Sequence, residues 1–296
     1  MDGIIVINKP KNYTSHDVVA KVKKVLQVKK VGHTGTLDPN ATGVLPLLLG
    51  EGTKLSKYLI EHDKTYEVTL KLGTRTDTLD GEGKIIETRK VDWTQYSEGM
   101  IEAVLESMIG INKQVPPMYS AIKVNGKKLY EYARKGESVT IEPREITIYK
   151  IVLQGIKPEQ DEIRFEVSSS KGTYIRSLCE TIAEKLNTIG YMKELNRTQV
   201  GRFSIKEAVS IEEIEKNQEN KDWLEDHIVT MEDLFKDRET IILESKKIPH
   251  FLNGVKITMK KVDGIYPIRD EKNEFIGIGV VKNQFLKRDI IAHNFN

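Results

Sequence analysis

The chain has 296 residues, of which 39% are hydrophobic and 30% are charged. This composition is typical of a soluble globular protein with room for one large and one small domain. No apolar run approaches the roughly 18 residues that a membrane-spanning helix needs, and the run at the N-terminus is too short for a signal peptide. The single cysteine, Cys179, excludes an internal disulfide and a cysteine-rich metal site, so we expect a cytoplasmic protein.

The net charge of +2 is unevenly distributed along the chain. Residues 1–35 carry seven Lys or Arg and two Asp or Glu, a balance of +5, whereas residues 207–240 carry four bases and twelve acids, a balance of −8. Residues 241–296 return to +4, with ten bases and six acids. Basic surfaces offset by an acidic connector favour a polyanion-binding protein, although lysines also cover ordinary solvated surfaces.

The first predicted elements are a buried strand within MDGIIVINKP and a helix within TSHDVVAKVKKVL. Thr14 is the expected N-cap of this helix, with Asp17 three residues on. Its apolar stripe consists of Val18, Val22, Val25 and Leu26. The loop GHTGTLDPNATGVLP follows, and its three glycines and two prolines predict a fixed backbone that presents one carboxylate, Asp38.

Alternation in YEVTLKLG predicts a strand in which Tyr66 shares one face with the core residues. Asn125-Gly126 predicts a two-residue hairpin turn between short strands. Residues 163–167 alternate as a strand, and a helical stripe then runs over residues 175–186. Thr173 is the expected N-cap, which places Tyr174 and Arg176 in the first helical turn, just past a strand end.

The C-terminal third has two different patterns. The acidic residues around 211–226 indicate a solvated helix face or connector. Beyond them, KKIPHFLNGVKITMKK and FIGIGVVKNQFLK have the pattern of short strands with glycine breaks. This pattern predicts a small β-barrel-like module.

Several classes of chemistry lack their sequence motifs. No G-x-x-x-x-G-K-[ST] phosphate loop occurs, no G-x-G-x-x-G follows a strand, and the six histidines give no zinc-ligand spacing. His33 and Asp38 could belong to a serine triad, but the G-x-S-x-G nucleophile elbow is missing. Metal catalysis and serine-type hydrolysis are therefore not expected.

Asp38 itself has two interpretations. Asp-Pro-Asn is a turn sequence in which the aspartate usually bonds its own backbone. Alternatively, a rigid loop could aim an ionised carboxylate that acts as nucleophile or base. An arginine nearby would hold the pKa of that carboxylate down, and Arg176 is one candidate from a distant strand–helix junction.

Long motifs occur in a fixed order between Gly3 and Phe203: INKPKNYTS, the Asp38 loop, KTYEVTLKLGTRTDTLDGEG, QVPPMYSAIKVNGKKLYEYARKG, SSSKGTYIRSLCE and ELNRTQVGRF. Together they resemble the TruB family of tRNA pseudouridine synthases. The resemblance implies isomerisation of a uridine, at position 55 in the T loop of tRNA, by base flipping and an aspartate-dependent break and re-formation of the glycosidic bond. No metal or redox cofactor is implied.

The resemblance also implies an α+β fold, with a mixed, mostly antiparallel sheet and a small β-rich, PUA-like C-terminal domain. The catalytic domain would cover residues 1–238, with an RNA-closing insertion at about 113–150, and the RNA-binding domain would cover 239–296. The implied partner is the T arm of tRNA, with no membrane and no required protein partner. A monomer is expected.

Site residues follow from the same resemblance. Asp38 would be the essential catalytic group, Tyr66 would stack on the target uracil, and Arg176 would pair with the catalytic carboxylate. Tyr174 and Leu195 match pocket positions around the uracil. A further set would contact the rest of the RNA, His33 as a wedge in the T loop and three lysines on phosphates: Lys123, Lys127 and Lys128. Lys9 and Pro10 match a motif that packs beneath the catalytic loop.

Two alternatives stay open at this stage. A guide-dependent, dyskerin-type pseudouridine synthase shares the aspartate loop, although such enzymes largely lack the MYSAIKVNGKKLYEYARKG insertion. From another class, the chain could act chiefly as an RNA-binding folding chaperone for tRNA, since opening the T loop is common to both activities.

Overall fold

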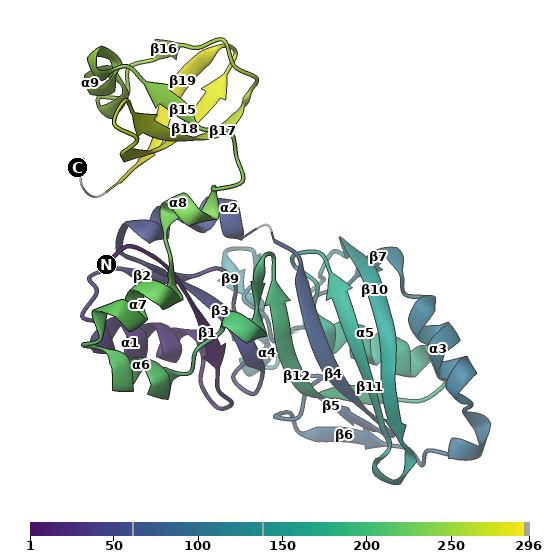
Figure 1. The fold of residues 1–296 in the computed structure, drawn as a ribbon. Coiled ribbons are helices and arrows are strands. Elements are labelled where there is room, and N and C mark those ends of the chain that lie inside the picture. The colour runs from purple at the N-terminus through teal and green to yellow at the C-terminus, as the bar shows by residue number, and fades with distance from the viewer. Residues whose placement is uncertain (61, 138, 293–296) are drawn as a thin grey trace.

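A computed structural model describes residues 1–60, 62–137 and 139–292. Residue 138, in the predicted insertion, and residues 293–296, in the predicted C-terminal domain, lie outside the described residues, as does residue 61. The described chain is an elongated α+β body around one long sheet, with a small β-rich unit at its C-terminal end (Figure 1). In the described part of the chain, no helix combines the length and apolarity needed to cross a membrane.

The long sheet has ten strands in the described residues, in the order β14-β1-β3-β12-β4-β11-β10-β7, with β2 beside β3 and β13 beside β12. Every strand pair in it is antiparallel except β12 and β3, which confirms the predicted mixed, mostly antiparallel sheet. The strands are β1 (Gly3–Lys9), β2 (Val31–His33), β3 (Thr42–Leu49), β4 (Lys64–Leu72), β7 (Gly110–Gln114), β10 (Arg144–Lys157), β11 (Glu162–Ser169), β12 (Gly190–Val200), β13 (Phe203–Ser204) and β14 (Ile228–Val229).

Two helices, α3 (Glu98–Glu106) and α5 (Ile175–Lys185), pack on one face of the β12-β4-β11-β10 half of the sheet (Figure 1). Tyr66 of β4 is buried on this face with Val68, Leu70 and Leu72, as the alternation predicted. Leu178 of α5 belongs to the same core. Tyr66 and helix α5 therefore lie on the same face of the sheet.

The start of α5 differs from the prediction. Tyr174, not Thr173, is the N-cap, and its extended backbone makes no side-chain cap hydrogen bond. The Thr173 hydroxyl instead donates to Ser170 O at 3.0 Å within the preceding turn. Arg176 lies in the first helical turn as expected, whereas Tyr174 precedes the helix.

The other half of the sheet is covered by α1 (Ser15–Val25), α6 (Ile211–Asn217) and α7 (Lys221–His227). The predicted N-cap of α1 is confirmed as a capping box: Asp17 N donates to Thr14 Oγ1 at 3.0 Å, and Thr14 N donates to Asp17 Oδ2 at 2.9 Å. Val18 and Val22 are buried against β1 and β3. The acidic segment 211–226 forms solvated helices, as expected.

Shorter elements complete the catalytic part. Two small hairpins project from it, and the predicted Asn125-Gly126 turn is confirmed by positive φ angles of 51° and 82°. These elements are β5 (Thr74–Thr76), β6 (Ile85–Thr88), β8 (Lys123–Val124), β9 (Lys127–Lys128), α2 (Ser56–Leu59), α4 (Leu129–Arg134) and α8 (Met231–Leu234). The β8–β9 hairpin and α4 lie within the predicted insertion.

The C-terminal unit is a curled five-stranded sheet in the described residues, ordered β15-β17-β18-β19-β16. Its elements are β15 (Ile241–Leu243), α9 (Ile248–Leu252), β16 (Ile257–Thr258), β17 (Gly264–Asp270), β18 (Phe275–Lys282) and β19 (Phe285–Ile291). The prediction of strands throughout KKIPHFLNGVKITMKK was wrong in its first half. A helix begins there at Ile248 and tolerates Pro249 in its first turn, because the missing N–H of Pro249 is not needed at that position, and Phe251 is buried.

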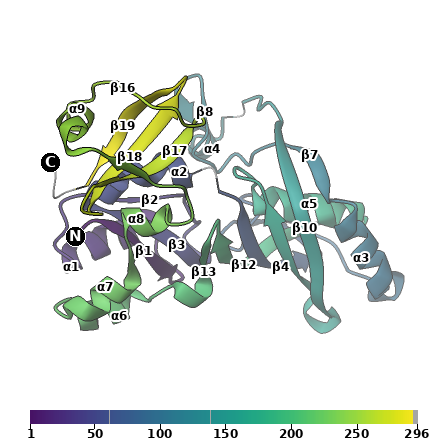
Figure 2. The same cartoon turned by 45° about the horizontal axis from the view of Figure 1, so that its top comes forward.

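The C-terminal unit rests on α2 and α8 (Figure 2). Ile278 and Ile290 share a hydrophobic cluster with Phe235, and Asp289 accepts hydrogen bonds from Lys57 and Tyr58. The packed contact indicates that the unit has a defined position beside the catalytic part. The exact boundary at 238/239 stays a prediction.

Gly43 is the second residue of β3, and its backbone conformation predicts that replacing it by alanine destabilises the protein. Its φ is +104°, and an added Cβ would lie 2.2 Å from Arg197 O. We expect Gly43→Ala to lower the free energy of unfolding by at least about 2 kcal/mol, measured by urea denaturation. Gly99→Ala is the matched control, because Gly99 lies in α3 with no atom within 4 Å of its added Cβ. That change should stabilise the protein by about 0.5–1 kcal/mol, and equal destabilisation by both would contradict the argument.

Candidate active site

The loop between β2 and β3 is held from beneath by α1 and the end of β1. Lys9, fully buried, donates from Nζ to Pro39 O at 2.9 Å and to Tyr13 O. Leu37 N donates to Ser15 Oγ at 2.9 Å, and the Ser15 hydroxyl donates back to Leu37 O at 3.2 Å. The backbone on both sides of Asp38 is thus fixed, and Lys9 lies beneath the loop as the resemblance implied.

Asp38 forms a two-point ion pair with Arg176. Arg176 Nε lies 3.1 Å from Asp38 Oδ2, and Arg176 Nη2 donates to Asp38 Oδ1 at 3.3 Å. Arg176 is only 6% exposed and also donates to Tyr119 O at 3.0 Å, whereas the Asp38 side chain is 35% exposed. The turn predicted for Asp-Pro-Asn is present, because Ala41 N donates to Asp38 O at 3.1 Å, but among the described residues no backbone N–H donates to the Asp38 carboxylate.

A second carboxylate, Asp80, lies on the other side of Arg176. Arg176 Nη1 is 3.6 Å from Asp80 Oδ2. Asp80 is 8% exposed and is fixed by Thr78 Oγ1, which donates to it at 2.5 Å, and by Glu82 N at 3.1 Å. Sequence reasoning missed Asp80, although it lies in the quoted TRTDTLDGEG motif, because Asp-Gly there reads as an ordinary turn.

Burial raises the pKa of Asp38 above its ordinary value, and the charges of Arg176 and then Lys9 oppose this rise. The nearby charge of Asp80 adds to it. The expectation that an arginine would hold the pKa down was therefore half right: Arg176 acts in that direction, but the desolvation of the carboxylate is larger. A carboxylate with this environment is a stronger base than an exposed aspartate.

Asp38 and Arg176 open onto a cavity of about 680 Å³. Three further residues of the predicted site line it from separate elements: Tyr66 from β4, Tyr174 from the turn before α5 and Leu195 from β12. Tyr119 and Tyr130 add aromatic surface from the predicted insertion. One aromatic-walled cavity is thus lined by Asp38, the only described carboxylate that pairs with Arg176 at two points.

The remaining predicted site residues do not line this cavity. His33 ends β2, where its Nδ1 accepts from Gly35 N at 3.2 Å, and burial lowers its pKa. Lys127 and Lys128 lie over the rings of Tyr132 and Tyr130, with Nζ 5.8 and 5.4 Å from the ring centroids. Lys123 is exposed on the same hairpin. Of the three lysines, Lys128 thus contacts a residue that lines the cavity, Tyr130, and the structure tests none of their roles.

Arg197 is a second site residue that sequence reasoning missed, although ELNRTQVGRF contains it. It lines the cavity from β12, opposite Tyr66 in the β12–β4 pairing. An arginine within an alternating strand carries no sequence signal that distinguishes an exposed side chain from one that is 1% exposed. Only the sheet order, which puts β12 between β3 and β4, reveals its position.

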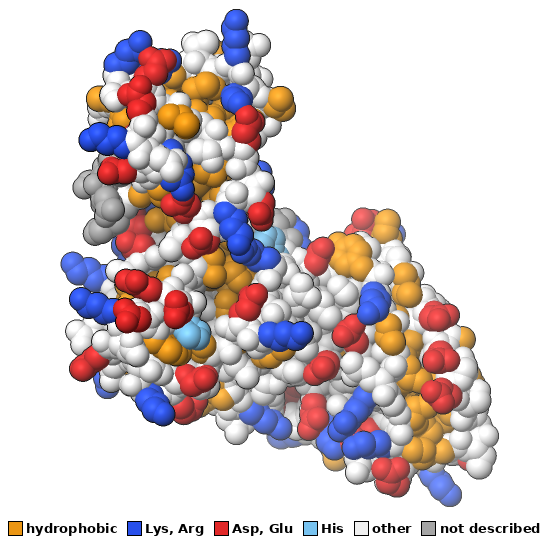
Figure 3. All heavy atoms as spheres, viewed as in Figure 1, with side chains coloured by type: hydrophobic (Ala, Val, Ile, Leu, Met, Phe, Trp, Pro, Cys, Tyr) orange, Lys and Arg blue, Asp and Glu red, His pale blue; other side chains and the backbone are white. Residues whose placement is uncertain are grey.

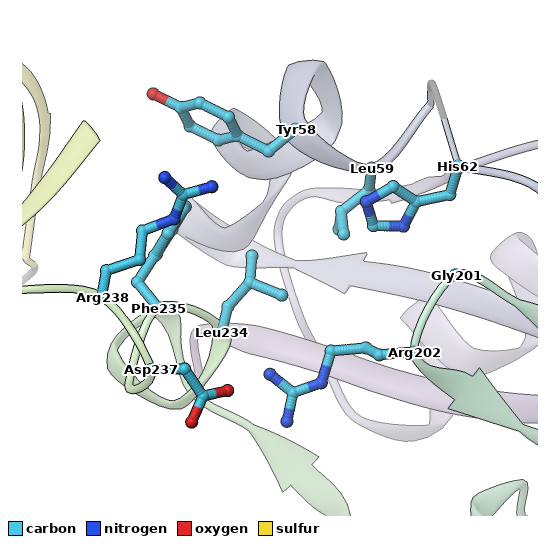
Figure 4. A pocket seen from close by; sticks show the side chains of 9 residues that line it. All are labelled: Tyr58, Leu59, His62, Gly201, Arg202, Leu234, Phe235, Asp237 and Arg238. Atoms are coloured by element: carbon cyan, nitrogen blue, oxygen red, sulfur yellow. The ribbon is translucent and has the colours of Figure 1, made fainter. Parts of the chain in front are cut away.

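A separate cavity of about 400 Å³ lies at the junction with the C-terminal unit (Figure 4). It is lined by Tyr58, Leu59, His62, Gly201, Arg202, Leu234, Phe235, Asp237 and Arg238. Asp237 is the one carboxylate in its lining, and Figure 4 shows that side chain beside Arg202. The surface in Figure 3 has basic and acidic side chains interspersed. Neither this surface nor the second cavity presents a carboxylate fixed by a buried arginine, as Asp38 is.

Two family models match consecutive parts of the chain. Residues 23–175 match the N-terminal domain of the TruB family pseudouridylate synthases, and residues 176–236 match the tRNA pseudouridylate synthase B C-terminal domain. The first match contains Asp38 and Tyr66, and the second begins at Arg176 and contains Leu195. All four of these residues therefore fall in matched segments.

Many curated proteins are similar over most of their length. The chain is 44% identical over 287 residues to a tRNA pseudouridine synthase B of Clostridium perfringens, covering 94% of this chain and 95% of that protein. It is 42% identical over 259 residues to the protein of that name in Bacillus cereus, covering 86% and 84%. The corresponding protein of Geobacillus thermodenitrificans is 49% identical over 220 residues, covering 73% and 72%.

Solved structures show the same fold at low sequence identity. A chain of a Cbf5–Nop10–Gar1 complex superposes with a TM-score of 0.68 at 24% identity, covering 98% of this chain and 83% of that chain. A chain of an H/ACA RNP bound to a substrate RNA containing 2′-deoxyuridine gives a TM-score of 0.69 at 22% identity, covering 98% and 84%. The shared fold extends from the long sheet into the C-terminal unit.

Proposed function

The chain belongs to the TruB family of pseudouridylate synthases, and we propose that it isomerises uridine to pseudouridine in the T loop of tRNA, at position 55. The observation that carries this proposal is the Asp38–Arg176 pair at the wall of an aromatic cavity. The relatives named tRNA pseudouridine synthase B support tRNA as the substrate. The T arm, a cytoplasmic location and a monomeric state are parts of the proposal.

The reaction needs a uracil held in one position and an ionised carboxylate beside it. The N1–C1′ bond breaks, the uracil turns, and a C5–C1′ bond forms, after which C5 loses a proton and N1 gains one. No atom and no electron is added overall. Asp38 would attack C1′, add to uracil C6, or remove a proton from C2′, and each of these routes requires its ionised form. Arg176 favours the ionised form of Asp38 and fixes the orientation of its carboxylate.

Base flipping explains the aromatic walls of the cavity. A uridine inside the T loop is unreachable, so it must leave its stack, and Tyr66 would replace about 1–3 kcal/mol of lost stacking. Tyr174 and Leu195 would hold the uracil edge and wall. His33 would wedge into the space beside the flipped base from the loop that carries Asp38.

The rest of the RNA arm would lie along basic surfaces. Residues 113–150 would close over the T arm, with phosphates on Lys123, Lys127 and Lys128. Residues 239–296 would form a PUA-like RNA-binding domain behind a catalytic domain of residues 1–238. Phosphate contacts of this kind give affinity without sequence information.

The two alternatives are less well supported. The likeness to chains of H/ACA complexes is below 25% identity and concerns the fold alone. The guide-dependent synthase is further disfavoured because the chain is more than 40% identical to proteins named tRNA pseudouridine synthase B and carries the β8–β9 hairpin within its insertion. A tRNA-folding chaperone would have no use for a carboxylate fixed at two points by a buried arginine.

The function is tested by tritium release from C5-labelled uridine in a T-arm RNA. We expect one tritium released per RNA, because only C5 exchanges its hydrogen for the sugar carbon. A matched RNA with cytidine at the target position and labelled uridines elsewhere should release none. Release from both RNAs would contradict the T-loop site, and release from neither would contradict the enzyme.

The phosphate contacts predict a steep salt dependence. Replacing Lys123, Lys127 and Lys128 together by alanine should reduce tRNA affinity about tenfold or more at low salt and flatten the slope of log Kd against log salt by about 2 to 3, because about 0.9 counterion is released per contact. Filter binding between 50 and 300 mM salt measures both. The matched control replaces three exposed lysines in or near the acidic segment by alanine: Lys206, Lys216 and Lys221. An equal loss of tRNA affinity in this control would contradict the assignment of the β8–β9 hairpin to the RNA-binding surface.

A further inference from the structure

Gln114 is a buried amide at the C-terminal end of β7, only 8% exposed. In the sheet it lies opposite Arg144 of β10. A buried amide costs free energy unless both its oxygen and its nitrogen find hydrogen-bond partners, whereas an apolar side chain would fill the same position without that cost. The partners of the Gln114 amide therefore indicate why a polar residue stands there.

Both partners of this amide belong to one residue, Tyr174. Tyr174 N donates to Gln114 Oε1 at 2.8 Å, and Gln114 Nε2 donates to Tyr174 O at 3.0 Å. The pairing resembles that of two residues on antiparallel strands, which exchange both of their backbone bonds. Two bonds restrain rotation as well as position. Gln114 thus fixes the backbone of Tyr174 from a strand that lies 60 positions earlier in the sequence.

Tyr174 has little support from its own segment. It is the N-cap of α5, its backbone is extended, and it makes no side-chain cap hydrogen bond. Lys171 and Gly172, in the turn before it, are exposed. In the part of the chain that the structure describes, Gln114 is the only side chain that bonds to the Tyr174 backbone. Because Tyr174 lines the cavity, the position of that wall depends on the Gln114 amide.

Arg176, two residues further on, is held without this amide. Its guanidinium pairs with the Asp38 carboxylate at two points and donates to Tyr119 O at 3.0 Å. None of these contacts involves Gln114. The loss of the amide should therefore be felt at Tyr174, whereas the ion pair of the site keeps its own bonds.

We propose that Gln114 is a positioning residue for recognition of the flipped base: through the Tyr174 backbone it sets the position of the Tyr174 ring against the uracil. The inference rests on the proposed function, in which Tyr174 holds the uracil edge. A flipped base loses its stacking neighbours, and the cavity replaces those contacts only where its walls are held in place. Without the amide, the protein should bind the base more weakly and the rest of the RNA equally well.

The test compares two T-arm RNAs, one with uridine and one with an abasic residue at the target position. All proteins carry Asp38→Asn, so that the uridine stays unchanged during the measurement. Gln114→Met, which keeps the size of the side chain and removes the amide, should raise the Kd of the uridine RNA about tenfold and that of the abasic RNA less than about twofold, as measured by filter binding. Gln154→Met is the matched control and should change neither Kd, because Gln154 is exposed on the neighbouring strand β10.

A purely structural role of Gln114 gives a different result. Its replacement would then weaken the binding of both RNAs by the same factor or of neither, and either result would overturn the inference. Gln114→Glu covers the case in which Gln114→Met does not fold, because it keeps the length of the side chain and an acceptor for Tyr174 N. Its carboxylate cannot donate to Tyr174 O, so the ratio of the two Kd values should rise at least about threefold. An unchanged ratio in folded Gln114→Glu would also overturn the inference.

A double variant shows whether Gln114 acts through Tyr174. In a Tyr174→Ala background, adding Gln114→Met should change the ratio of the two Kd values by less than about twofold, because no ring is left to position. A tenfold change there would mean that Gln114 acts through another residue, and the inference would fall. Tritium release by protein with native Asp38 reports the proposed function separately: no release contradicts the enzyme, whereas release with an unchanged Kd ratio in Gln114→Met contradicts only the role of Gln114.

Discussion

Asp38→Asn is expected to abolish pseudouridine formation, by at least about 10⁴-fold in kcat, while tRNA affinity stays within about threefold. The amide has the shape of the carboxylate and still accepts a bond from Arg176, so the loop and the cavity are preserved. It has no negative charge, and all three routes open to Asp38 need one. A loss of this size is what removing an essential nucleophile or base produces. The measurement is single-turnover tritium release beside filter binding.

The matched control is Asp77→Asn. Asp77 is an exposed aspartate on the hairpin between β5 and β6, where it accepts from Lys84 N, and it does not line the cavity. Its replacement should leave turnover unchanged. If Asp38→Asn keeps more than about one tenth of the native rate, Asp38 is not the reacting group. If it loses tRNA binding as well, the carboxylate serves recognition instead of chemistry.

Local patterns were enough to predict much of the fold. The capping box at Thr14, the alternating face of β4 and the Asn125-Gly126 turn each depend on residues a few positions apart, and each is confirmed. The first half of KKIPHFLNGVKITMKK was misread as a strand because only its glycine was taken as a break, whereas Pro249 lies in the first turn of a short helix. Family resemblance, and not periodicity, supplied the mostly antiparallel sheet.

The site was predictable only where a motif named the residue. Asp38 and Arg176 were paired through resemblance, since they are far apart in sequence and no local rule brings α5 to the β2–β3 loop. Asp80 and Arg197 were overlooked for a physical reason. Their identities matter through burial, and burial depends on which strands are neighbours in the sheet. The parallel β12–β3 pair, which sets the position of Arg197, joins segments more than 150 residues apart.

Replacing Arg176 is expected to shift the pH dependence of activity, and the charges around Asp38 determine the direction of that shift. Activity requires ionised Asp38, so the rate falls as pH drops through its pKa. Burial raises that pKa and Arg176 opposes the rise. Arg176→Ala should therefore move the acid limb of the kcat/KM profile to higher pH and lower kcat/KM at neutral pH by about 10²-fold or more, as the loss of a buried charge partner does. Tritium-release assays between pH 5 and 9 measure both.

Asp80→Asn should shift the pH dependence in the direction opposite to Arg176→Ala. The Asp80 charge raises the pKa of Asp38, so its removal should move the acid limb to lower pH, whatever happens to the maximal rate. Arg75→Ala is the control, because Arg75 pairs with Glu180 on the same helix α5 without touching Asp38. Limbs that move in the same direction in both site variants would mean that a group other than Asp38 titrates. Opposite movements around an unchanged control limb are expected when a carboxyl that feels both charges in opposite senses titrates, as Asp38 and its neighbour Glu82 do.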